Sequence, residues 1–180
     1  FMREQSRATE LAHALVSTGN SCGIKTRALL TDMNQPLGGM VGNSLEVLEC
    51  IQILRGEANE AARPVLDLSL ELCAHMLVLA NVDQTIEAAH ERLDNVLHSG
   101  KALECLQSNI AAQGGDPRVC DAPRDFLPLV SENVKVESPR SGFITKVDTT
   151  EIGHAIAAIG GGRVRIEDTV DPTVGFTSEL

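Results

Sequence analysis

Glu49 is the residue with the clearest chemical potential, because it is a carboxylate in a stretch that is otherwise largely apolar. Residues 43–54 read NSLEVLECIQIL, and apolar side chains fall on nearly all sides of the helix that this pattern predicts. At 100° per residue, Glu49 points between Leu45 and Ile53. Burial of an isolated charge is prohibitively costly, so Glu49 should be hydrogen-bonded, paired with an Arg or Lys, or bound to a cation. From the residues alone, an ion pair, or water at the helix end, is the simpler interpretation. The main apolar stripe of the helix consists of Val47, Cys50, Ile51 and Leu54.

A glycine-rich loop precedes this helix. Residues 32–42 contain one Pro and three Gly, which indicates that regular structure stops there. Asn43, followed three residues later by Glu46, predicts the cap of the helix. The glycines could cradle a phosphate at the helix N-terminus. Their spacing matches neither G-x-G-x-x-G nor the P-loop, so we favour a role in permitting positive φ. These glycines are Gly38, Gly39 and Gly42.

The elements around the loop predict an α/β fold, with a central sheet flanked by helices and followed by the start of a small α+β C-terminal domain. Ala28–Thr31 is a short apolar run, as expected for a buried interior strand. A strand that leads through a loop into a capped helix is the usual place for a ligand in such a domain. Helical periodicity also predicts helices near residues 8–20, 64–77, 83–99 and 102–113.

Composition divides the chain into three parts. Residues 1–116 are the predicted α/β domain portion, and residues 117–140 are a proline-rich connecting segment. Residues 141–180 are an incomplete C-terminal α+β domain. In that domain we expect a strand at Phe143–Val147, a helix at Ile152–Ile159 and a strand at Arg163–Ile166.

The composition excludes several classes of partner. A formal net charge of −10 disfavours nucleic acids and anionic membranes, and the absence of Trp and Tyr disfavours base stacking. No apolar run approaches the roughly 18 residues of a membrane span, and no signal peptide opens the sequence. The five Cys are scattered without a C-x-x-C pair, so we expect reduced thiols in a cytoplasmic protein. The histidines are interpreted as packing or surface groups.

The loop and helix also carry a resemblance to a known family. TDMNQPLGGMVGNSLEV, residues 31–47, resembles the signature of the thymidine and pyrimidine-nucleoside phosphorylase family. Phe1-Met2 is similar to the end of that family's G-S-G-A-F-M run, and Gly142–Arg163 resembles its C-terminal domain. The resemblance spans nearly the whole chain and is strongest at residues 25–56. It implies that the chain is a fragment without the N-terminal part and the extreme C-terminus.

The resemblance implies a potassium site. Its ligands in this chain would be the main-chain carbonyls of Leu37 and Met40 and the carboxylate of Glu49. Oxygen ligands suit such a hard cation, and a glycine-rich loop can turn its carbonyls toward one point. The resemblance also places Phe1 against the pyrimidine base. The family's catalytic residues precede Phe1, so we expect none in this chain and expect the chain alone to be inactive.

The implied activity is that of a pentosyltransferase, a type of glycosyltransferase. Such an enzyme cleaves thymidine or a related pyrimidine nucleoside with inorganic phosphate, giving the free base and (deoxy)ribose 1-phosphate. A homodimer formed through the helical part that precedes this chain is also implied. Two alternatives stay open: a related phosphoribosyltransferase, and a non-catalytic interaction module with the same fold. The sequence does not distinguish thymidine from uridine as the substrate.

Overall fold

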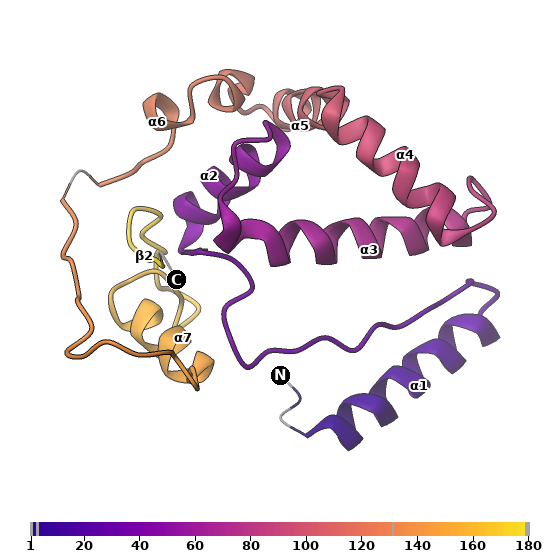
Figure 1. Cartoon of the computed structure of the whole chain (residues 1–180), viewed down its shortest axis with the longest axis horizontal. Helices are drawn as coiled ribbons and strands as arrows, with labels where there is room; N and C mark the ends of the chain where they lie inside the picture. Colours follow the sequence, from indigo (N-terminus) through magenta and orange to yellow (C-terminus); the bar gives the residue numbers. More distant parts are fainter. Residues whose placement is uncertain (1, 3, 131, 179–180) are drawn as a thin grey trace. The chain divides into compact units, whose positions relative to one another are not determined.

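A computed structural model describes residues 2, 4–130 and 132–178 (Figure 1). Helices dominate the described chain, and a two-stranded sheet accompanies them. The elements in order are α1 (Gln5–Ser21), β1 (Met40–Val41), α2 (Asn43–Leu54), η1 (Glu60–Ala62), α3 (Arg63–Leu79), α4 (Ile86–His98), α5 (Lys101–Ala112), η2 (Pro117–Cys120), α6 (Pro123–Phe126), α7 (Thr149–Ala158) and β2 (Phe176–Thr177). Within the described residues, no helix is both long and apolar enough to cross a membrane.

The helices agree with the periodicity of the sequence. The predicted helix at residues 43–54 is confirmed as α2, and the other predicted helices are observed with ends shifted by a few residues. Local capping fixes some of these ends. The Asp148 carboxylate accepts from the Glu151 amide at the start of α7, and the Thr85 hydroxyl accepts from the Ala88 amide at the start of α4.

The predicted strands are wrong at three places. Ala28–Thr31, Phe143–Val147 and Arg163–Ile166 form no strand, and Phe143 is 98% exposed. A strand needs a neighbouring backbone for its N–H and C=O groups, and these segments find no ladder among the described residues. The one ladder that the described residues form joins β1 to β2 in antiparallel register, with Met40 opposite Thr177 and Val41 opposite Phe176.

The chain forms two compact units. The first comprises Phe1–Asp32 and Ser69–Leu93, and the second comprises Met33–Leu68 and Asp94–Leu180. These units are not the parts predicted from composition, and the division at residues 116 and 140 stays a prediction. Residues 33–42 of the glycine-rich loop and all of α2 belong to the second unit.

The second unit has a small core built on α2. Ile51 is fully buried and packs with Val119 and Cys120 of η2. Half-buried apolar side chains close this cluster, namely Leu103, Leu106, Ile110 and Leu127. The buried face of α2 differs from the predicted stripe, because Val47 and Cys50 are exposed. Instead, α2 buries Ser44, Leu48, Glu49, Ile51 and Ile53.

Candidate functional site

The Glu49 side chain is buried, as the sequence predicts, and the loop before α2 supplies its partners. Glu49 is 5% exposed, and its Oε1 accepts a hydrogen bond of 2.8 Å from the Gly39 amide. The Met40 amide also bonds this carboxylate. Among the described residues no Arg or Lys forms an ion pair with Glu49, so the interpretation as a simple ion pair is not supported. The carboxylate holds the loop through backbone amides.

Burial makes the charged form of Glu49 unfavourable. Loss of water around the carboxylate raises the pKa of Glu49 above its ordinary value. The amides of Gly39 and Met40 oppose this shift, while the nearby charge of Glu46 adds to it. A positive charge placed next to this carboxylate would therefore stabilise its ionised form.

Two glycines let the loop pack closely against its neighbours, one of them against the carboxylate. A methyl group at Gly38 would overlap Glu49 Oε2 and would lie 2.9 Å from Cγ2 of Val65. A methyl group at Gly39 would lie 2.7 Å from the Cβ of Ala61. Gly38 therefore lets the loop approach the carboxylate, and Gly39 lets it approach Ala61. The predicted role in permitting positive φ is confirmed for Gly42, which has φ 132°, and is wrong for Gly38 and Gly39.

The cap of α2 differs from the prediction. Asn43 is the first residue of the helix, and the N-cap is Gly42, with φ 132° and ψ 148°. Glu46 still reaches back toward the cap, because its Oε1 accepts from the Gly42 amide at 3.2 Å. The reciprocal half of the predicted capping box therefore forms, but around a glycine.

Two models of known families match this chain, and the first covers the loop and α2. A family model described as "Glycosyl transferase family, a/b domain" matches residues 2–103, which is more than half of the chain. The chain belongs to this glycosyl transferase family. A second model, described as "Pyrimidine nucleoside phosphorylase C-terminal domain", matches residues 143–180. The resemblance to pyrimidine-nucleoside phosphorylases is thus confirmed, and the a/b domain agrees with the predicted α/β class.

Curated relatives of this glycosyl transferase chain point to the same group. Proteins named pyrimidine-nucleoside phosphorylase, from Staphylococcus aureus strains USA300, NCTC 8325 / PS 47 and bovine RF122/ET3-1, are 39% identical to it over 176 residues. The match covers 98% of this chain and 40% of the length of each relative.

The three residues implied as potassium ligands come from one short loop and α2. Met40 bonds Glu49 through its amide, and Leu37 directly precedes Gly38, whose backbone lies against the carboxylate. An ionised carboxylate offers about four acceptor positions, so two amides leave capacity for a cation. A mixed set of carboxylate and carbonyl oxygens fits a hard cation. The potassium assignment stays a prediction, and Phe1, implied to contact the base, lies outside the described residues.

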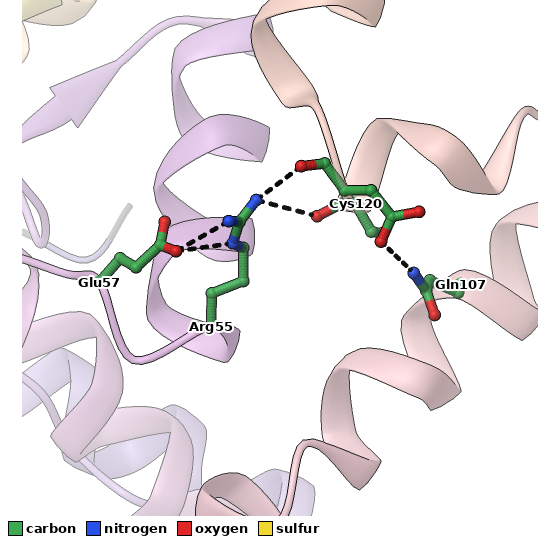
Figure 2. Close-up of polar contacts among 5 residues, drawn as sticks. Arg55, Glu57, Gln107 and Cys120 are labelled. Carbon is green, nitrogen blue, oxygen red and sulfur yellow. Dashed lines mark hydrogen bonds and ion pairs between the residues drawn. The ribbon is translucent and has the colours of Figure 1, made fainter.

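In this glycosyl transferase chain, Arg55 fixes the other end of α2. Its Nη1 donates to the Asp121 carbonyl at 2.8 Å and to the Cys120 carbonyl at 3.5 Å (Figure 2). Its Nε and Nη2 bond Glu57 at 2.9 and 2.8 Å. Gln107 donates to the Asp121 side chain at 3.0 Å, which adds α5 to the network. Arg55 therefore ties the helix that carries Glu49 to η2, beside the buried Cys120.

Replacing Arg55 with Met is expected to lower the free energy of unfolding by about 1–2 kcal/mol, because the carbonyls of residues 120 and 121 lose a charged donor. The matched control is Arg63→Met, which removes an ion pair with Asp67 whose side chains are 64% and 54% exposed. Such an exposed pair contributes about 0–1 kcal/mol. Urea denaturation of both variants measures the difference, and equal losses would contradict the anchoring role of Arg55.

Sequence reasoning missed a polar network in the first unit. Glu71 bonds His75 Nε2 at 3.1 Å and His90 Nε2 at 2.9 Å. Arg27 bonds Nδ1 of His75 at 2.9 Å. The i, i+4 spacing of Glu71 and His75 was the available signal, whereas Arg27 and His90 come from distant positions in the sequence. Among the described residues, no group of three or more His, Cys, Asp or Glu could hold a metal ion.

Proposed function

We propose that this chain is part of a pyrimidine-nucleoside phosphorylase, which cleaves thymidine or a related pyrimidine nucleoside with inorganic phosphate. The observation that carries the proposal is the match of two models to one chain: the a/b domain at residues 2–103 and the phosphorylase C-terminal domain at residues 143–180. The relatives named pyrimidine-nucleoside phosphorylase support it over nearly the whole chain.

The reaction breaks the glycosidic bond between C1′ of the sugar and the base nitrogen, and forms a bond from C1′ to a phosphate oxygen. The base departs with the bonding electrons and takes up a proton. A site for this reaction must hold the phosphate against C1′ and stabilise the charge that develops on the base. We assign neither task to a residue of this chain.

The contribution of this chain is to fix the loop at residues 37–40. Glu49 orients the amides of Gly39 and Met40, and the ends of α2 are held by Glu46 and Arg55. A potassium ion bound by Glu49 and the carbonyls of Leu37 and Met40 would supply charge balance for the buried carboxylate. The loop amides and Arg55 donate these hydrogen bonds, the carboxylates of Glu46 and Glu49 accept those of the amides, and none of these groups transfers a proton.

The remaining parts of the proposal follow from the resemblance. We propose that the protein acts as a homodimer in the cytoplasm and takes phosphate as its second substrate. Phe1 would contact the pyrimidine ring. A phosphoribosyltransferase is the alternative within enzymes, and the match to the phosphorylase C-terminal domain favours the phosphorylase. A non-catalytic interaction module is the alternative outside enzymes.

The product of the whole reading frame that encodes this chain should be assayed with thymidine and with uridine. Release of the base that depends on phosphate and yields a pentose 1-phosphate supports the phosphorylase. Turnover that instead requires phosphoribosyl diphosphate indicates the transferase, and no turnover with either donor indicates the interaction module. The 180-residue chain assayed alone is expected to be inactive in all of these reactions.

A further inference from the structure

The loop that holds Glu49 is covered from its other side by residues 172–178 near the C-terminus. β2 pairs with β1 across this contact. On one side of the ladder the Ser178 amide donates to the Gly39 carbonyl at 2.7 Å. On the other side the Ser44 amide donates to the Pro172 carbonyl at 3.2 Å. We name residues 172–178 the C-terminal strap.

Two glycines allow the strap to lie directly on the loop. A methyl group at Gly42 would overlap the Val174 carbonyl, and a methyl group at Gly175 would overlap the Val41 carbonyl. The second methyl would also lie 2.7 Å from Cδ1 of Leu45, in α2. The two backbones are therefore in contact without intervening side chains, and a side chain at either glycine would separate them.

Gly39 connects the two contacts. Its amide donates to Glu49, and its carbonyl accepts from Ser178. The next residue, Met40, bonds Glu49 through its amide and lies opposite Thr177 in the ladder. The same conformation of the loop therefore donates hydrogen bonds to Glu49 and pairs with the strap.

We propose that the C-terminal strap is a positioning element for the Glu49 site. Docking of the strap holds the Gly39 and Met40 peptides against the carboxylate, and a cation bound at Glu49 stabilises strap docking in return. The two events share one loop conformation, so their coupling is reciprocal. The cation half of this inference rests on the proposed function, whereas the coupling of the strap to Glu49 does not.

Two variants separate the strap from the loop. Ser178→Pro removes the single amide that donates to Gly39 and adds no bulk at the glycine contact. Gly175→Ala forces the backbones apart. The matched control is Gly153→Ala in α7, where an added methyl group meets nothing within 4 Å. Hydrogen exchange of individual amides is measured in the product of the whole reading frame that encodes this chain, together with melting temperature in potassium and in a large organic cation at equal ionic strength.

We expect both strap variants to exchange the Gly39 and Met40 amides about tenfold faster than the control, and to shrink the melting difference between the two cations. The inference is overturned if the Phe176 and Thr177 amides exchange faster while Gly39 and Met40 are unchanged. Should Gly175→Ala fail to fold, Ser178→Pro decides alone. A wild-type chain that melts equally in both cations refutes the potassium assignment, and the exchange rates at Gly39 and Met40 still decide the coupling.

Discussion

Replacing Glu49 with Gln is expected to abolish the dependence of stability on potassium. Glu49 is 5% exposed, and burial raises the pKa of its carboxylate because it disfavours the ionised form. A bound cation would offset the cost of burying this negative charge. Gln keeps the shape and removes the charge. A ligand present at about 100 times its dissociation constant stabilises the folded state by about 2.7 kcal/mol, which corresponds to roughly 5–10 °C in a chain of this size. That difference should be seen in the wild type and lost in the variant.

The measurement compares melting temperatures in potassium and in a large organic cation at equal ionic strength. The control is Glu104→Gln, which removes an exposed carboxylate of α5 in the same unit and should leave the potassium response intact. In the product of the whole reading frame, Glu49→Gln should also lower phosphorolysis. If wild type melts at the same temperature in both salts, the cation assignment is wrong, and Glu49 is a structural acceptor for the two loop amides.

The sequence predicted the helix that carries Glu49 because the information is local. Apolar periodicity over residues 43–54 predicted α2, and the apolar side chains on nearly all sides of this helix predicted that the carboxylate is buried. The helix cap was assigned one residue late, because Asn43 is a frequent cap residue and the backbone angles of Gly42 are not visible in a sequence.

The partners of Glu49 could not be predicted, because they depend on loop conformation and on distant segments. The amides of Gly39 and Met40 reach the carboxylate only once the loop folds back, and the strap that covers them is contributed by residues 172–178. Residues 28–31 have the composition of a strand but no ladder partner among the described residues, and strand formation depends on such long-range pairing. A carboxylate can also be satisfied by main-chain amides, which leave no trace in the side-chain pattern.

Gly42→Ala is expected to destabilise the second unit by about 2–6 kcal/mol, through two effects that act together. At φ 132° and ψ 148°, Gly42 occupies a backbone region that is nearly exclusive to glycine, which accounts for about 1–3 kcal/mol. The added methyl group would also overlap the Val174 carbonyl and lie 2.9 Å from the Cα of Gly175, and such overpacking costs about 1–3 kcal/mol. Gly56→Ala is the matched control, because Gly56 has φ 71° in the same unit but nothing within 4 Å of the added methyl group. Urea denaturation should therefore show a clearly larger loss for Gly42→Ala, together with faster hydrogen exchange at Phe176 and Thr177. Equal losses in the free energy of unfolding for the two variants would mean that the strap moves to accommodate the methyl group with no loss of stability. The contact between Gly42 and Gly175 would then not hold the loop.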